Sequence, residues 1–236
     1  AWIDQGMQWE KGFTFAKFRN APIAPRKVAL PKGKSANPVD RFLSPYYAEN
    51  NVREVPSVGD DVFARRVFLD VLGILPTAGE LKVFREDARS DKREHLVKEL
   101  LADKENYAEH WVTFWNDSLR NSYTRQYHGG GGKPITGWLK SALSENKPYD
   151  QFVRELINPV GGSDGFIKGV VWRGTVNASQ VTEMQAAQNV AQVFMGLNIK
   201  CASCHDSFIN DWTLKETYSF AANFAGGPLD IHRCDK

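Results

Sequence analysis

Apolar residues recur at steps of three and four along much of the chain, and this spacing constrains the fold more than any other feature. After residue 60 the repeating positions are Val62, Phe63, Val67, Phe68, Val71 and Leu72. Such spacing gathers apolar side chains on one face of an α-helix, whereas a half-buried strand alternates every second residue. No convincing two-residue alternation is present, so the sequence predicts a mostly α fold.

Helix-capping signatures predict where several of these helices begin. A Thr-x-x-Glu or Thr-x-x-Gln pattern satisfies two backbone N–H groups at the start of a helix. The three patterns of this kind begin at Thr77, Thr182 and Thr213. Asp91 and Asp103 are candidate N-caps of two further helices, the second of which we expect to run to about Asn121.

Proline and glycine predict where helices end. We expect Pro76 to end the helix that starts near residue 61, and Gly196 to close the helix that runs through Phe194. Further helices are expected near residues 38–43, 135–146 and 148–156, and a short strand is expected at residues 170–172.

The N-terminal part of the chain differs from the rest in its proline content. Between residues 16 and 60 it holds Pro22, Pro25, Pro31, Pro38, Pro45 and Pro56. Proline fixes φ and removes a donor, which favours an extended segment here. We expect residues 1–36 to be the tail of a preceding domain plus an extended linker, and residues 37–226 to form one helical domain. Residues 227–236 would begin a linker to the next domain, so both ends are expected to lie within a longer polypeptide.

The composition excludes several classes of protein. Hydrophobic residues make up 42% and charged residues 25% of the 236 residues, which is ordinary for a globular protein. Thirty basic and 28 acidic side chains leave a net charge of +2, too small to indicate a nucleic-acid partner. No apolar run approaches the ~20 residues of a membrane-spanning helix.

The residues that carry recognisable chemistry are Cys201, Cys204 and His205, which form the pattern C-x-x-C-H. Two thiols three positions apart on one helical turn can add to the two vinyl groups of a haem, and the adjoining imidazole can then bind the iron. The motif therefore predicts one covalently attached haem c, with His205 as an iron ligand. We expect His205 to donate its free ring N–H to a carbonyl or side chain, which would fix its orientation.

Other interpretations of the two thiols fit less well. A thioredoxin-type pair needs a βαβ setting, a zinc site needs four ligands, and a disulfide across two residues is strained. For the third cysteine, Cys234, we expect no role in the site. Haem attachment needs reduced thiols outside the cytoplasm, so we expect a periplasmic, cell-surface or otherwise exported protein.

The second axial ligand of the iron is not fixed by the motif. No methionine follows His205, so the arrangement common in small cytochromes is excluded. We favour His110, because Tyr107, Trp111 and Phe114 share its helix face and form an aromatic wall suited to a porphyrin. The alternatives that stay open are Met184, Met195 and His128, with His95 and His232 less favoured.

Three further side chains are candidate neighbours of the haem. Trp212 follows the motif closely and could cover a haem edge, although core packing alone would also explain it. Arg173 or Lys200 could pair with the haem propionates, whose carboxylates attract such cations.

Several segments together resemble a known family. They are residues 1–9 (A-W-I-D-Q-G-M-Q-W), 63–77 (F-A-R-R-V-F-L-D-V-L-G-I-L-P-T), 107–121, 147–152 (K-P-Y-D-Q-F) and the cysteine motif. They are similar to the second cytochrome-c-like domain of large multidomain proteins abundant in planctomycetes, in which a small cytochrome c domain comes first. The resemblance implies that residues 1–9 close that preceding domain, and it favours His110 as a ligand. Many relatives read C-H-D-H where this chain has Ser207 after Asp206, so any role of the second histidine is in doubt here.

The function we expect is electron transfer by an exported c-type cytochrome domain with two axial ligands. Its partner would be the preceding cytochrome c domain or another redox protein. The alternatives are a haem enzyme of peroxidase-like or oxidative type, or a module that senses a gas or a polysaccharide. Both need an open iron position, and the glycine-rich residues 129–132 give the sensing alternative weak support.

Overall fold

The computed structural model describes residues 27–53, 56–121, 134–170 and 181–231. These residues form helices joined by turns and loops, with no β-strand among them, so the prediction of a mostly α fold is confirmed. They fall into two compact units, which are described separately. We call residues 27–121 and 134–163 the N-terminal unit and residues 164–170 and 181–231 the C-terminal unit. The expected domain boundaries at residues 37 and 226 stay a prediction.

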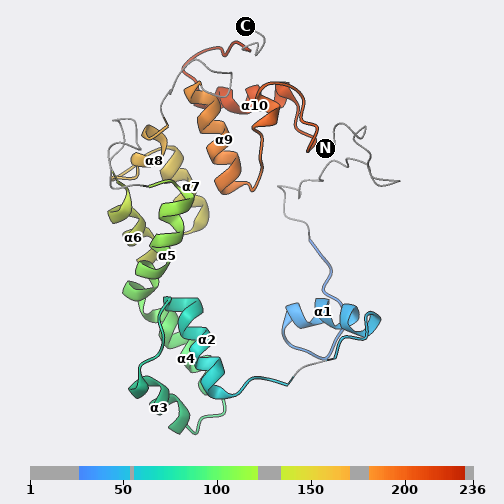
Figure 1. The fold of residues 1–236 in the computed structure, drawn as a ribbon, viewed down its shortest axis with the longest axis vertical. Coiled ribbons are helices and arrows are strands. Elements are labelled where there is room, and N and C mark those ends of the chain that lie inside the picture. Colours follow the sequence, from blue (N-terminus) through green and yellow to red (C-terminus); the bar gives the residue numbers. More distant parts are fainter. Residues whose placement is uncertain (1–26, 54–55, 122–133, 171–180, 232–236) are drawn as a thin grey trace, which may run out of the picture. The chain divides into compact units, whose positions relative to one another are not determined.

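The N-terminal unit is built from seven helices in its described residues (Figure 1). They are α1 (Pro38–Glu49), α2 (Asp60–Leu72), α3 (Ala78–Glu86), α4 (Lys92–Ala102), α5 (Lys104–Ser118), α6 (Thr136–Ser144) and α7 (Tyr149–Ile157). Helix α2 packs against α3, α4 and α5, and α5 packs against α6. The first core is formed by α2, α3 and α4, and its buried residues are Ala64, Phe68, Leu72, Phe84, Leu96 and Leu100.

The C-terminal unit is smaller and contains the cysteine motif. Its described helices are α8 (Gly165–Lys168), α9 (Thr182–Phe194), the short 3-10 helix η2 (Cys201–Ser203), α10 (Leu214–Ala221) and the 3-10 helix η3 (Ala222–Phe224). Helix α10 packs against α9, η2 and η3. The core between them is formed by Met184, Ala187, Ala191, Leu197, Ile199, Tyr218 and Ala221.

Two of the three predicted capping boxes are present and one is not. Thr77 with Glu80 and Thr213 with Glu216 make both reciprocal bonds of the box, so α3 and α10 begin as expected. The prediction at Thr182 is wrong, because Val181 is the N-cap of α9 and no side chain caps this end. Val181 packs against the core of the C-terminal unit, which places Thr182 in the first turn of α9 rather than at its N-cap.

The end of α2 also differs from the prediction. The helix stops at Leu72 rather than near Pro76, because Gly73 adopts the left-handed conformation with φ of 70° and donates its N–H to the carbonyl of Leu69. Gly196 behaves as predicted, with φ of 64° just after α9. Helix α5 ends at Ser118, slightly before the expected position, while α1 continues well past residue 43. The strand expected at residues 170–172 lies mostly outside the described residues.

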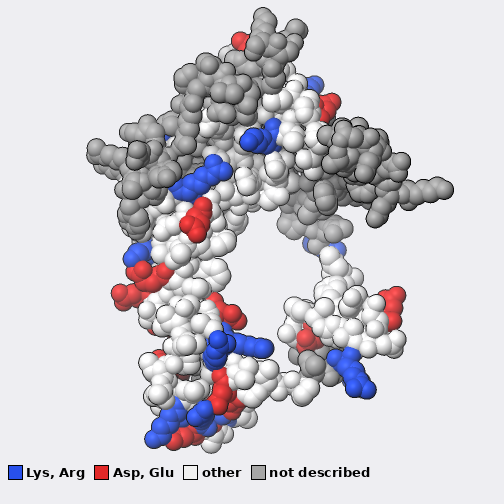
Figure 2. Space-filling model, in the orientation of Figure 1, with Lys and Arg blue, Asp and Glu red and all other residues white. Residues whose placement is uncertain are grey.

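Ion pairs join the first turns of α2 to α3 and α4. Asp60 accepts bonds from both Lys92 and Arg93, and the side-chain hydrogen bonds from these two residues lower the pKa of Asp60 below its usual value. Asp61 pairs with Arg85 of α3. Figure 2 shows basic and acidic side chains interspersed over this part of the unit rather than gathered by sign.

The pair of Asp87 and Arg89 predicts a pH dependence of stability. Hydrogen bonds from Arg89 lower the pKa of Asp87 from 3.8 to about 2. Between these values the unfolded chain binds more protons than the folded chain, so the stability from this pair is complete above pH 3.8 and is lost as the pH falls toward 2. Urea unfolding at a series of pH values is expected to show a shallower acid decline for Asp87→Asn and for Arg89→Met. Declines equal to that of the unchanged protein would contradict this prediction.

Candidate functional site

The turn that carries the two cysteines exposes them on one side and is anchored on the other. Cys201, Ala202 and Ser203 form the 3-10 helix η2, and Cys204 follows as its C-cap. Residues three apart in a 3-10 helix lie one above the other, which places Cys201 and Cys204 on the same side of the turn. Both cysteines are half-buried, whereas Ala202 and Ser203 are fully buried. The two small residues between the cysteines therefore fix the turn to the protein interior.

Hydrogen bonds tie this turn to its surroundings. The hydroxyl of Ser203 donates to the carbonyl of Lys200 at 2.7 Å and accepts a bond from Gln188 of α9 at 3.2 Å. Just before the turn, Asn198 accepts from the N–H of Lys200 through its side chain, and its carbonyl accepts from Asn210. Hydrogen bonds before and within the turn therefore hold the backbone that carries the two thiols.

His205 has the hydrogen bond that was expected for an iron ligand. Its Nδ1 lies 2.7 Å from the carbonyl oxygen of Asp206. A carbonyl can only accept, so this nitrogen carries the proton, and the lone pair of Nε2 is left for another partner. The ring is exposed and stacks on Phe208 with 5.6 Å between ring centres and 16° between planes. This is the tautomer that binds a metal through Nε2.

The loop after His205 is stabilised by buried polar side chains. Ser207 is 2% exposed, and its hydroxyl accepts from the N–H groups of Ile209 and Asn210. Asn210 in turn accepts from the N–H of Trp212. Ser207 thus closes the loop that follows His205.

His110 lies on α5 within the aromatic wall that its helical spacing predicted. Trp111 contacts Tyr107, His110 and Phe114, with ring centres 6.2, 5.1 and 6.1 Å apart. The ring of His110 is half-buried, and the edge with Nδ1 faces Gly73 at the end of α2. The Nε2 atom is therefore on the edge turned away from that contact.

Trp111 contributes an unusual feature next to His110. Its indole Nε1 is buried and has no hydrogen-bond partner among the residues that the structure describes. A buried indole N–H normally has an acceptor. The indole N–H beside His110 is thus a buried donor without an acceptor in the described part of the chain.

The other candidates lie as follows. Met184 is fully buried in the core of the C-terminal unit, and Met195 and Trp212 pack against that core. The ring centre of Trp212 lies 6.2 Å from that of Phe220. His95 of α4 is half-exposed and lies 3.3 Å from Asp91. Lys200 is exposed at the start of the motif. His128, Arg173, His232, Cys234 and residues 1–9 and 129–132 lie outside the described residues.

The predicted site residues belong to two different units. Cys201, Cys204, His205 and Trp212 lie in the C-terminal unit, whereas His110 and Trp111 lie in the N-terminal unit. Within the described ranges, no group of three or more His, Cys, Asp or Glu side chains is arranged to hold a metal ion. No helix in these ranges is long and apolar enough to cross a membrane.

Comparison with known proteins gives one result. A family model named PSCyt2, with the description "Protein of unknown function (DUF1549)", matches residues 38–227. The chain belongs to the PSCyt2 family. No curated protein and no solved structure was found to match it. The family match assigns no cofactor, so the haem site of this PSCyt2 chain stays a proposal.

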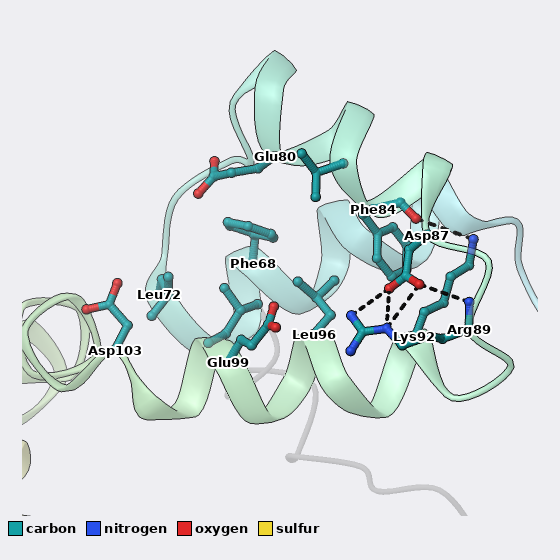
Figure 3. Close-up of a pocket in the computed structure, with 12 residues that line it drawn as sticks. Phe68, Leu72, Glu80, Phe84, Asp87, Arg89, Lys92, Leu96, Glu99 and Asp103 are labelled. Carbon is teal, nitrogen blue, oxygen red and sulfur yellow. Dashed lines mark hydrogen bonds and ion pairs between the residues drawn. The ribbon is translucent and has the colours of Figure 1, made fainter.

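The PSCyt2 chain also has a hollow of about 370 Å³ between α2, α3 and α4 (Figure 3). Phe68, Leu72 and Leu96 project toward it. Its lining cations are engaged, since Arg89 bonds to Asp87 and Lys92 bonds to Asp60. The hollow opens onto the first core and contains none of the predicted haem residues.

Three residues near the site were not predicted from the sequence. Phe208 stacks on His205, the carbonyl of Asp206 orients it, and Gly73 contacts His110. Phe208 lies three residues after His205, so a local search could have found it. The contact of Gly73 joins two separate helices and has no signal in the local sequence.

Proposed function

We propose that this chain is a c-type cytochrome domain with one haem c. Cys201 and Cys204 would hold the haem through thioethers, and His205 and His110 would be the axial ligands of its iron. The observation that carries the proposal is the C-x-x-C-H turn itself. Its two thiols share one side of a braced 3-10 helix, and His205 is held in the tautomer with a free Nε2.

The covalent attachment is a balanced addition. At each cysteine the thiol S–H would add across a vinyl C=C bond of the haem, so that sulfur would bond to one carbon and hydrogen to the other. No electron is gained or lost, and no oxidant is required. The reaction needs both cysteines as thiols. We propose that haem attachment takes place in an exported protein, periplasmic or at the cell surface.

Exposed apolar side chains next to both imidazoles suit a porphyrin. Near His205, Phe208 is 66% exposed and Ile209 39%. Beside His110, Phe114 is 53% exposed, and Ile74 and Leu75, which directly follow Gly73, are also exposed. Large apolar side chains left in water are unfavourable, and a haem that covers them would remove that cost.

The polar groups beside the imidazoles suit the haem propionates. The N–H of Trp111 has no acceptor among the described residues, and a carboxylate would supply one. Lys200 is exposed next to Cys201 and can pair with such a carboxylate. These two residues and the apolar side chains fit the group that the cysteine motif implies.

Electron transfer follows from the ligand set. When bound, the haem supplies an iron that changes between the ferric and ferrous states. If His205 and His110 both bound the iron, they would leave no iron position for a substrate, which would favour electron transfer over catalysis. We therefore propose that the domain exchanges electrons with a preceding cytochrome c domain or another redox protein.

One preparation tests this function. The chain is expressed with a haem c maturation system, and its intact mass and optical spectrum are recorded. We expect the mass of the polypeptide plus one haem, a low-spin ferric spectrum that cyanide leaves unchanged, and a ferrous spectrum that carbon monoxide leaves unchanged. A bare polypeptide would refute the haem, whereas a high-spin haem that binds these ligands would favour an enzyme or a gas sensor.

A further inference from the structure

We propose that Gly73 is a positioning residue for His110, and that α2 thereby sets the orientation of this imidazole. The inference rests on the proposed function, since it explains how His110 would be held ready for the iron. Gly73 touches no cofactor in this proposal and acts only through the ring of His110.

The contact between the two residues leaves no space for a side chain at position 73. A Cβ atom placed on Gly73 would lie 2.2 Å from Nδ1, 2.8 Å from Cε1 and 2.9 Å from Cγ of His110. All three distances are shorter than van der Waals contact allows. The imidazole therefore lies directly on the backbone at the end of α2, with its Nδ1 edge toward Gly73.

Gly73 also needs the left-handed conformation. Its φ is 70°, and its N–H closes α2 by donating to the carbonyl of Leu69. Gly161, Gly162 and Gly196 have positive φ as well, but a Cβ atom on any of them would meet nothing within 4 Å. Among the described glycines, Gly73 combines the backbone requirement with a close contact to a candidate ligand.

The end of α2 that carries this contact is anchored in the first core. Phe68 and Leu72 bury the last turns of α2 in the first core, at 4% and 5% exposure. Trp111 also packs against the ring of His110 edge-on, with 5.1 Å between the ring centres. The imidazole contacts both the backbone of Gly73 and the indole of Trp111, so a ligand position can be preorganised before any metal binds.

A double-mutant cycle measures the contact without reference to the haem. The variants are Gly73→Ala, His110→Ala, the double variant and Gly161→Ala as the matched control for left-handed strain. We expect Gly161→Ala to lower Tm by about 2–8 °C, the effect of a side chain in the left-handed region. Gly73→Ala is expected to lower Tm further, and in the His110→Ala background its effect is expected to fall to that of the control. Equal effects of Gly73→Ala in both backgrounds would overturn the proposal.

The optical spectrum of the same holoproteins measures the consequence for the iron. We expect Gly73→Ala to convert low-spin ferric haem to high-spin, as His110→Ala does, and added imidazole to restore the low-spin form in both. Gly161→Ala is expected to stay low-spin. A low-spin Gly73→Ala protein beside a high-spin His110→Ala protein would overturn the positioning role. If His110→Ala itself stayed low-spin, His110 would not be an axial ligand, and its positioning by Gly73 would have no role at the iron. The double-mutant cycle in Tm would still measure the contact between Gly73 and His110.

Discussion

Replacing Cys201 and Cys204 together by alanine is expected to abolish covalent haem attachment. The variant, expressed with a haem c maturation system, would show the mass of the bare polypeptide and no haem band after denaturing electrophoresis. The reason is chemical, because each thioether needs the sulfur of one of these residues. Cys234→Ala removes the third cysteine, which stands outside the motif, and serves as the control that keeps its haem.

The expected loss does not depend on unfolding. Both cysteines are only half-buried, and the turn is fixed by Ala202, Ser203 and the bonds of Ser203 to Lys200 and Gln188. Removal of two partly exposed thiols therefore leaves the anchors of η2 in place. Far-UV circular dichroism of the variant is expected to match that of the control, which separates loss of the cofactor from loss of the fold.

Single replacements refine this result. Cys201→Ala or Cys204→Ala leaves one thiol, so at most one thioether can form and the yield of attached haem falls. The spectrum of the reduced haem in alkaline pyridine distinguishes one saturated vinyl group from two. A double variant that still carried covalent haem would contradict the assignment of these two cysteines.

The parts of the fold that the sequence predicted are the local ones. The boxes at Thr77 and Thr213 depend on residues three positions apart, and both formed. The prediction at Thr182 failed because α9 begins one residue earlier than the pattern implied, with Val181 as its N-cap and packed against the core of the C-terminal unit. Pro76 was expected to end α2, but Gly73 comes first and can adopt the left-handed conformation that ends a helix.

The same distinction applies to the candidate site. The geometry of the thiols and of His205 follows from a few adjacent residues, so their spacing was informative. The aromatic wall around Trp111 follows from helical spacing within α5 alone. The support of His110 by Gly73 comes from the packing of α2 against α5, and no spacing within one segment encodes such a contact.

His110→Ala is expected to give the second large effect, a complete change in the coordination of the iron. The methyl group of alanine cannot bind a metal, so one axial position would be vacated or taken by water, and the ferric haem would become high-spin. Carbon monoxide would then bind the ferrous form, which the unchanged protein is expected to resist. The optical spectrum in both oxidation states, with and without carbon monoxide, is the measurement.

His95→Ala is the matched control for this experiment. His95 lies in the same unit, on α4, and its ring contacts Asp91 rather than an aromatic wall. We expect this variant to stay low-spin and closed to carbon monoxide. If instead His110→Ala stayed low-spin, another side chain would be the ligand, and Met184, Met195 and His128 would be replaced next. Of the side chains that the structure describes, Met184 is fully buried in its core whereas the ring of His110 is half-buried, which favours His110 as the ligand that we propose.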